Sequence, residues 1–282
     1  MNNLSLIRGF HATLGRLAPK TVARRMRRQF MTPRNLPPRD WEMPLLGSAE
    51  RITLRFGLSA LRWGSGPTVL LMHGWEGRPT QFASLIEALV GAGYGVVALD
   101  GPAHGRSPGR EASVVLFARA LLEAAGELPP LHAVIGHSMG GASALLASQM
   151  GLRANALVSI SAPSRILGPL RSFASYMGLP PKARAHFVSQ VETHAGMPAA
   201  HLDVKRYQLD IPGLVVHAED DPVVPANDAR VIHDTWFDSQ LLRLERGGHQ
   251  RLLADPRLVG AVLGLLEEIR ETQAKGVAAA QR

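Results

Sequence analysis

The sequence has no cysteine among its 282 residues. This absence excludes disulfide bonds, thiolate zinc sites and a cysteine nucleophile, and it fits a reducing compartment such as the cytoplasm, where we expect the protein to work. No apolar run approaches the roughly 18 residues of a membrane-spanning helix. The N-terminal arginines follow the apolar patch LSLI instead of preceding it, so we expect no secretory signal.

Acidic residues are almost absent from the N-terminal segment. Residues 1–40 carry nine Lys or Arg and a single acid, Asp40, whereas the formal net charge of the whole chain is +8. The rest of the chain therefore balances to zero, and the basic excess belongs to an arm. No aromatic–basic interleaving and no known nucleic-acid module accompanies this charge, so we expect no nucleic-acid partner.

The arm over residues 1–40 predicts two amphipathic helices. One set of its apolar residues repeats at helical spacing and can pack on an apolar surface: Leu4, Ile7, Phe10, Leu14 and Leu17. A second helix is expected to begin near Pro19, with apolar side chains opposite a run of arginines. We expect a hairpin docked on the main domain with its arginines in solvent. Peripheral contact with an anionic membrane, or with a partner protein, is the alternative.

Short runs rich in Val, Leu and Ile alternate with helix-like segments after Arg51. The runs typical of buried strands are TVLLMH, YGVVALD, HAVIGH, ALVSIS and GLVVHA. Continuous apolar runs separated by helices are typical of parallel strands buried on both faces. We therefore predict an α/β fold with a mostly parallel central sheet, helices on both faces and an antiparallel hairpin around Gly57.

Residues 164–210 interrupt this alternation. They are rich in Pro, Gly, Met and Ala, show helical spacing in places and contain no clear buried strand. We predict a small helical cap inserted between two strands, the alternative being a long crossover connection. The core domain then comprises residues 41–163 and 211–282.

Chemically reactive side chains follow almost every predicted strand. In open parallel sheets, ligands bind outside the carboxyl ends of the strands. The groups placed there are HGW at 73–75, Asp100, Ser138, the Asp220–Asp221 pair and His249. Their convergence on one edge predicts a functional site.

Ser138 lies in the motif GHSMG, residues 136–140, between a predicted strand and a predicted helix. The flanking glycines permit a sharp turn that exposes the hydroxyl at a helix N-terminus, where the dipole favours negative charge. A serine that merely caps the helix is the alternative. Activation needs a base and an orienting carboxylate, and His249 and Asp221 supply these in the chain order Ser, Asp, His.

Five motifs together resemble the α/β-hydrolase superfamily over roughly residues 51–272. They are MHGW, ALDGPAHGRS, GHSMGG, HAEDDPVVP and GGH, in that order. The resemblance implies a catalytic triad of Ser138, Asp221 and His249. Asp220, the neighbour in DDPVVP, is the alternative acid.

The same resemblance implies an oxyanion hole formed by the backbone N–H groups of Trp75 and Met139. We expect substrate contacts from His73, Gly74, Trp75 and His137. In the loop of ALDGPAHGRS, an alanine stands where the family pattern has glycine. The histidine that follows this alanine is a weaker candidate for a second base.

The predicted function is a serine hydrolase that cleaves a small or medium carboxylic ester or thioester through an acyl-enzyme. We expect no cofactor, and no His/carboxylate cluster has metal-ligand spacing. The expected partner is a small-molecule ester or acyl substrate, and the sequence does not indicate an oligomeric state. The same triad also suits C–C bond hydrolysis or acyl transfer. A non-catalytic ligand-binding protein of the same fold is the alternative of another class.

Overall fold

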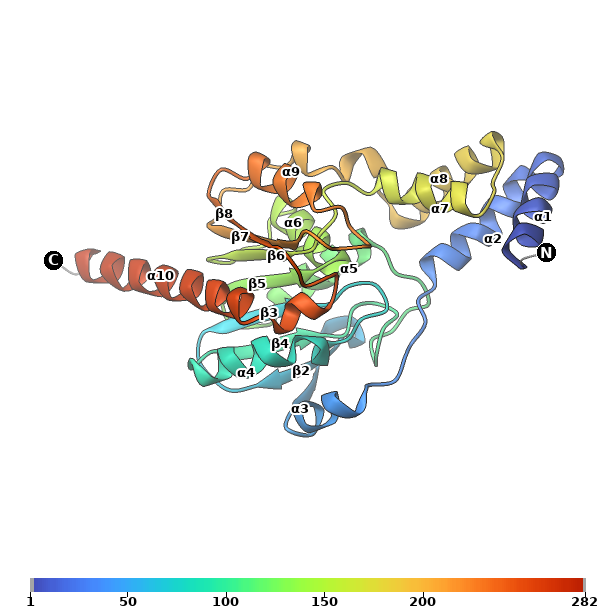
Figure 1. Ribbon diagram of the computed structural model, residues 1–282. Coiled ribbons are helices and arrows are strands. Elements are labelled where there is room, and N and C mark those ends of the chain that lie inside the picture. Colours follow the sequence, from blue (N-terminus) through green and yellow to red (C-terminus); the bar gives the residue numbers. More distant parts are fainter. Residues whose placement is uncertain (1–2, 281–282) are drawn as a thin grey trace.

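An eight-stranded sheet forms the centre of the molecule, in the order β1-β2-β4-β3-β5-β6-β7-β8 (Figure 1). The computed structural model describes residues 3–280, and side chains over residues 5–275. The pairs β1–β2 and β2–β4 are antiparallel, and all other neighbours are parallel. The strands are β1 (Glu50–Thr53), β2 (Ser59–Trp63), β3 (Thr68–Met72), β4 (Gly95–Leu99), β5 (Leu131–His137), β6 (Leu157–Ile160), β7 (Gly213–Ala218) and β8 (Ser239–Leu244).

Helices cover both faces of this sheet. Side chains alternate along each parallel strand, so that Leu70 joins one hydrophobic cluster and Leu71 joins the other. One cluster contains α5 (Val114–Ala125), α6 (Met139–Gln149) and α9 (Asn227–Thr235), and the other contains α4 (Ala83–Gly91) and α10 (Pro256–Ala280). The predicted α/β fold with a mostly parallel sheet between two helical layers is confirmed.

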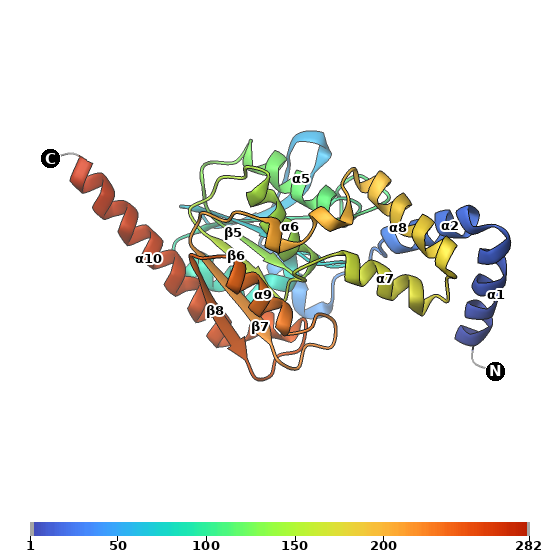
Figure 2. The ribbon, with the colours of Figure 1, turned by 90° about the horizontal axis from the view of Figure 1, so that it is seen from above.

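The remaining helices lie outside these two layers. They are α1 (Asn3–Leu17), α2 (Pro19–Met31), α3 (Met43–Gly47), α7 (Leu167–Tyr176) and α8 (Pro181–Ala195). Short 3-10 helices cover Asp40–Glu42, Arg55–Gly57, Pro79–Phe82, Ala199–His201, Val204–Arg206 and Arg251–Ala254. Helices α1, α2, α7 and α8 gather at one end of the molecule, and the C-terminal end of α10 lies at the other (Figures 1 and 2).

The N-terminal arm packs on the segment between β6 and β7. That segment contributes α7 and α8, and α2 lies against α8. A third hydrophobic cluster joins α2 to α7 and α8 through buried residues: Val22, Ala23, Met26, Met31, Leu170, Ala174, Phe187 and Val191. Leu14 of α1 packs against the same cluster. We call α1, α2, α7 and α8 together the lid, because one apolar core connects these four helices.

The expected orientation of α1 is wrong for most of its apolar stripe. Ile7, Phe10 and Leu17 are 44%, 55% and 79% exposed, so these three side chains face solvent. Leu14 is half-buried and packs against the third cluster, and the side chain of Leu4 lies outside the described side chains. The buried face carries His11 and Gly15. The ring of His11 bonds to the carbonyl of Met177 at 2.9 Å. Close approach to the cap decides which side of α1 is buried.

Hydrogen bonds and ion pairs tie the end of α2 and the following linker to the core. The N–H of Ala112 donates to the carbonyl of Met31 at 2.8 Å. Glu111 forms ion pairs with Arg27 of α2 and, at 2.7 Å, with His194 of α8 when that ring is protonated. These contacts hold the lid over the carboxyl ends of the parallel strands.

Candidate active site

Ser138 occupies the sharp turn between β5 and α6. Its backbone is left-handed, with φ 54° and ψ −121°, a conformation that L residues rarely adopt. The neighbouring glycines are required by space: a Cβ on Gly136 would lie 2.3 Å from the carbonyl oxygen of Gly140, and one on Gly140 would lie 2.2 Å from that of Met72. The strained turn holds the hydroxyl at the N-terminus of α6, as the GHSMG motif predicts.

The structure brings Ser138, His249 and Asp221 into one hydrogen-bonded chain. The ring Nε2 of His249 lies 2.9 Å from Oγ of Ser138, and its Nδ1 lies 2.8 Å from Oδ2 of Asp221. Because the carboxylate accepts from Nδ1–H, Nε2 is left as an acceptor for the serine hydroxyl. A hydroxyl, an imidazole and a carboxylate joined in this order have the geometry in which a serine can be activated as a nucleophile.

The carboxylate of Asp221 is stabilised in its charged form. Its Oδ1 accepts the backbone N–H groups of Val223 and Val224 at 2.8 and 3.0 Å, and His217 lies 3.3 Å from Oδ2. Burial raises the pKa of this carboxyl, but the hydrogen bonds from His217, His249 and the two N–H groups together hold the pKa far below its ordinary value.

Asp220, the alternative acid, faces a different set of donors. Its Oδ1 accepts the N–H groups of Gly247 and Gly248 at 2.8 and 2.7 Å, and the bond from Gly248 is the main reason that its pKa is lowered. This carboxylate therefore fixes the loop that precedes His249, while the neighbouring Asp221 contacts the imidazole itself.

The backbone after β3 passes close to the nucleophile turn. A Cβ on Gly74 would lie 2.9 Å from Cβ of Ser138, so only glycine fits there. Trp75 and Met139, the two residues predicted to donate N–H groups to an oxyanion, both line the cavity onto which Ser138 opens.

His73 and His104 link the loops behind the cavity. His73 donates from Nδ1 to the carbonyl of Gly74 at 2.7 Å and accepts the N–H of Gly101 at 2.9 Å. Burial, with a smaller effect from His104, lowers the pKa of His73 to about 3, so this ring stays neutral. His104 accepts the N–H of Glu76 at 3.0 Å. Both rings are engaged by backbone groups, and among the described side chains neither ring is hydrogen-bonded to Ser138.

His137 supports the loop that carries His249. Its Nε2 lies 2.7 Å from the carbonyl oxygen of His249, and the two ring centroids are 4.9 Å apart. Burial and the neighbouring His249 lower the pKa of His137 to about 4. Trp75 is the one expected substrate contact on the cavity wall: His73, Gly74 and His137 are not among the lining residues, and they act from behind the wall.

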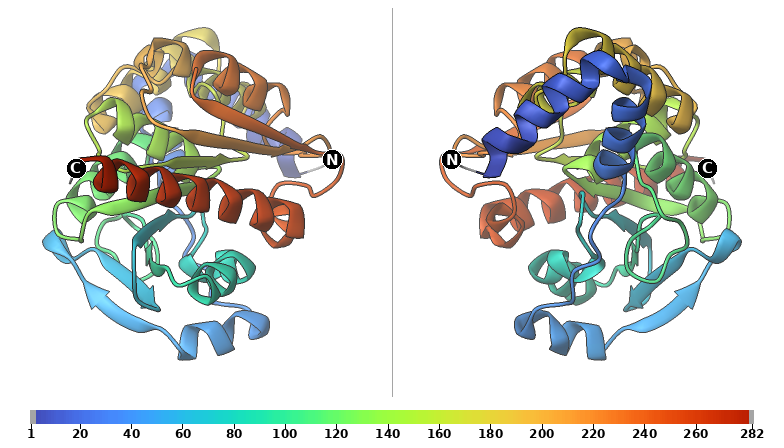
Figure 3. Two further views of the ribbon diagram at one scale, coloured as in Figure 1. Left: turned by 90° about the vertical axis from the view of Figure 1, so that its left-hand side faces the viewer. Right: turned by 90° about the vertical axis from the view of Figure 1, so that its right-hand side faces the viewer.

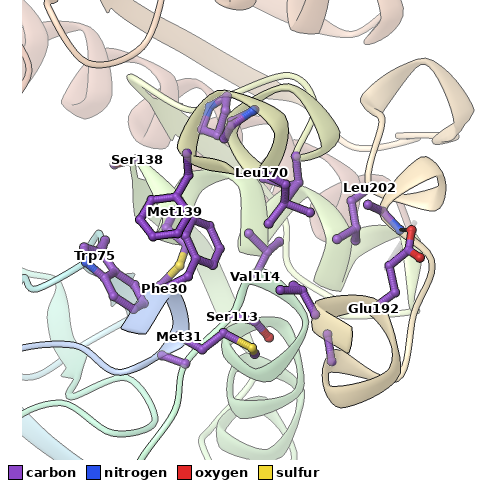
Figure 4. A pocket seen from close by; sticks show the side chains of 18 of the residues that line it. Phe30, Met31, Trp75, Ser113, Val114, Ser138, Met139, Leu170, Glu192 and Leu202 are labelled. Carbon is purple, nitrogen blue, oxygen red and sulfur yellow. Dashed lines mark hydrogen bonds between the residues drawn. The ribbon is translucent and has the colours of Figure 1, made fainter. Parts of the chain in front are cut away.

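A cavity of about 410 Å³ opens beside Ser138, and apolar side chains line most of it. Figure 4 shows Phe30, Trp75 and Met139 gathered near Ser138, with Glu192 and Leu202 across the space. Phe30 and Met31 come from α2, so the arm forms part of the wall. The sequence pattern does not predict that either residue lines a cavity, although it does indicate the apolar side of the second arm helix.

Within residues 3–280, no group of three or more His, Asp or Glu side chains could hold a metal ion. No helix in the described part of the chain is both long and apolar enough to cross a bilayer.

A family model described as the alpha/beta hydrolase family matches residues 69–262, which include all three hydrogen-bonded side chains. The chain belongs to this family. The fold is that of the α/β hydrolases, with the lid placed over the carboxyl ends of the strands.

Solved structures with the same fold share little sequence with this α/β hydrolase. An esterase from Pyrococcus furiosus is 20% identical with a TM-score of 0.62, covering 84% of this chain and 98% of that one. A bacterial membrane phospholipase A is 19% identical with a TM-score of 0.62, covering 95% of this chain and 97% of that one.

A curated relative matches part of the chain only. The dihydrolipoyllysine-residue acetyltransferase component of the acetoin cleaving system of Cupriavidus necator is 34% identical over 113 residues. The match covers 38% of this chain and 26% of that protein, so the chain spans about a quarter of the relative's length.

Proposed function

We propose that this protein hydrolyses a carboxylic ester or thioester through an acyl-enzyme on Ser138. The observation that carries the proposal is the chain of hydrogen bonds from Ser138 through His249 to Asp221, at 2.9 and 2.8 Å, beside an apolar cavity. A serine that only capped α6 would need neither an imidazole nor a buried carboxylate. The side chain of Ser138 also makes no capping hydrogen bond to that helix.

In the proposed reaction, Nε2 of His249 takes the hydroxyl proton while Oγ of Ser138 attacks the substrate carbonyl carbon. The tetrahedral oxyanion accepts the N–H groups of Trp75 and Met139, each contributing about 3–4 kcal/mol of transition-state stabilisation. His249 then gives its proton to the departing alcohol or thiol. Water, deprotonated by the same ring, attacks the acyl-enzyme, and the carboxylic acid leaves as Ser138 regains its proton.

The cavity favours an apolar acyl group of moderate size. Its volume of about 410 Å³ lies toward the lower end of the range of roughly 300–1,000 Å³ for small-molecule sites. Phe30, Leu170 and Leu202 on its wall offer apolar contact, whereas the carboxylate of Glu192 disfavours an anionic group at that end. Because a structural relative is a phospholipase, glycerolipid esters belong among the substrates to test.

Acyl transfer is the second candidate, favoured by the partial match to an acetyltransferase component. Both reactions share the acyl-enzyme and differ only in the acceptor. Adding a thiol or alcohol acceptor to the ester assay separates them: a transferase forms the transacylated product faster than the free acid. Hydrolysis of a C–C bond would require release of a carbon leaving group, and no contact in the described site favours it.

The proposal is tested by hydrolysis of p-nitrophenyl esters of increasing acyl length. We expect a maximum at a moderate length for the wild type and a loss of at least about 10³-fold in kcat for Ser138→Ala. Ser161→Ala is the matched control, because its hydroxyl is buried, has no hydrogen-bond partner among the described residues and lies outside the cavity lining. Equal rates for wild type and Ser138→Ala would overturn the proposal and favour a ligand-binding protein.

A further inference from the structure

Helix α1 presents an uncovered apolar face to solvent. Leu6, Phe10 and Leu17 are 54%, 55% and 79% exposed, and Ile7 is 44% exposed. Because residues three, four and seven apart share a helix face, these side chains form one arc along α1. We call these four residues the α1 arc. Figure 3 shows, in its right-hand view, that α1 is the outermost element at the lid end of the molecule.

The opposite face of α1 is firmly packed, so the arc is not the result of a detached helix. The ring of His11 is buried and bonds to the carbonyl of Met177 at 2.9 Å. A Cβ on Gly15 would lie 2.7 Å from the ring of Pro180, so the helices are in close contact there. The fold therefore fixes α1 in place and leaves four of its large apolar side chains exposed.

Basic residues greatly outnumber acidic ones on the helices of the lid that carries the α1 arc. Residues 1–39 hold nine Lys or Arg and no acid. The basic side chains exposed on the two arm helices are Arg8, Arg16, Lys20, Arg24, Arg25 and Arg28. Helices α7 and α8 add three further basic residues against the single acid Glu192. The apolar arc thus lies in a strongly basic end of the molecule.

We propose that the α1 arc docks this protein on an anionic lipid bilayer. Apolar side chains on one face of a helix, with Lys and Arg beside them, are the features that hold a helix in the plane of a membrane interface. Each basic side chain near an anionic leaflet adds attraction. A second copy of this chain fits the same face poorly, because it would bring two strongly basic surfaces together.

Docking at this end places the lid cavity near the membrane. Helix α1 contacts α2, and α2 supplies Phe30 and Met31 to the cavity wall. A lipid ester taken from the bilayer would therefore meet the element that forms the wall. The docking itself goes beyond the proposed function and does not depend on Ser138 being a nucleophile.

Co-sedimentation with vesicles tests the proposal on the full chain. The vesicles are phosphatidylcholine with or without phosphatidylglycerol, at low and at high salt. We expect binding to the anionic vesicles, weaker binding to the neutral ones, and weakening by salt. The double variant Phe10→Ser, Leu17→Ser should bind anionic vesicles at least about tenfold less tightly. The reason is that two apolar side chains that would be buried in the bilayer are lost.

Phe237→Ser is the matched control. This phenylalanine is fully exposed, and it lies just before β8 at the amino end of that strand, away from the lid. It should bind vesicles as the wild type does. Ester hydrolysis by the double variant should be unchanged, since neither residue lines the cavity; this readout also shows that the variant is folded.

Three outcomes would overturn the proposal. The first is failure of the wild type to bind anionic vesicles, which is measured as protein left in the supernatant. The second is binding of the double variant to anionic vesicles as tight as that of the wild type. The third is self-association of the wild type in analytical ultracentrifugation that the double variant abolishes, because the arc would then be an interface between copies of this chain.

Discussion

At the scale of single residues, the site is held by groups that have no chemical role of their own. The N–H of Ser138 donates to the carbonyl of Ile160 at 2.8 Å, which helps to hold a backbone conformation that costs about 1–2 kcal/mol for a non-glycine residue. The neutral rings of His73 and His137 brace the loops on either side. Geometry at Ser138 is therefore fixed before any substrate binds.

The division of labour between the two adjacent acids gives the first prediction. Asp221→Asn should lower kcat/KM by about 10⁴-fold, because the imidazole loses its orienting carboxylate. Asp220→Asn should have a much smaller effect, since its carboxylate contacts backbone N–H groups of the glycine loop instead. Steady-state ester hydrolysis by both variants checks this. A larger loss for Asp220→Asn would make it the orienting acid.

The depressed pKa values of His73 and His137 predict acid sensitivity. Their folded-state values of about 3 and about 4 lie below the ordinary 6.5, so the unfolded chain binds these protons first. The contribution of these two rings to stability is complete above pH 6.5. It falls as the pH drops toward the folded-state values, by up to about 1.4 kcal/mol per pH unit for each ring.

Denaturant unfolding at several pH values between 7 and 4 measures this effect. His73→Gln should reduce the pH dependence of the unfolding free energy, because one of the two buried rings no longer titrates. A slope equal to that of the wild type would exclude His73 as a source of the acid sensitivity.

Ala103 offers a stabilising substitution. Its φ is 63°, in the left-handed region. Ala103 is the alanine of ALDGPAHGRS that stands where the family pattern has glycine. Ala103→Gly should raise the free energy of unfolding by about 0.5 kcal/mol, the relief of strain being partly offset by the greater freedom of glycine in the unfolded chain. Thermal and denaturant unfolding check the sign. A destabilised variant would show that the methyl group packs favourably.

At the scale of secondary-structure elements, α2 joins the arm to the site. Phe30 contacts Phe173 and Phe187 of the cap at ring-centroid distances of 4.9 and 5.7 Å, and it also lines the cavity. The same side chain therefore belongs to the apolar core of the lid and to the wall of the cavity. Any substrate that fills the cavity contacts residues far apart in the sequence.

Truncation of this wall predicts a change in acyl preference. Phe30→Ala should shift the optimum of the p-nitrophenyl ester series to longer acyl chains and should raise KM for the wild type's best ester more than it lowers kcat. The substitution enlarges the cavity and removes contacts to the acyl group, whereas Ser138 itself is unaltered. An unchanged chain-length profile would show that the acyl group binds elsewhere.

Some of these elements could be predicted from the sequence and others could not. The buried strands and the GHSMG turn were visible because continuous apolar runs and close glycines follow from local constraints. The outward stripe of α1 was not, because its burial is decided by the fit of Gly15 against Pro180. For the same reason, the contribution of Phe30 to the cavity depended on an unknown packing partner.

At the scale of the whole molecule, the basic arm and the candidate active site lie at the same end. The lid helices lie at the opposite end of the molecule from the C-terminal end of α10. Ser138, Asp221 and His249 follow the carboxyl ends of β5, β7 and β8, and residues of the lid line the cavity beside Ser138. The strongly basic arm belongs to the same end. A substrate approaching from an anionic surface would therefore meet the lid first.

Labelling with a fluorophosphonate probe tests the central claim most directly, because the probe reacts only with an activated serine. We predict the addition of one probe per chain by intact mass, mapped to Ser138, with no labelling of Ser138→Ala. Asp221→Asn should label far more slowly than the wild type. Absence of labelling, or labelling that persists in Ser138→Ala, would contradict the account of Ser138 as the nucleophile.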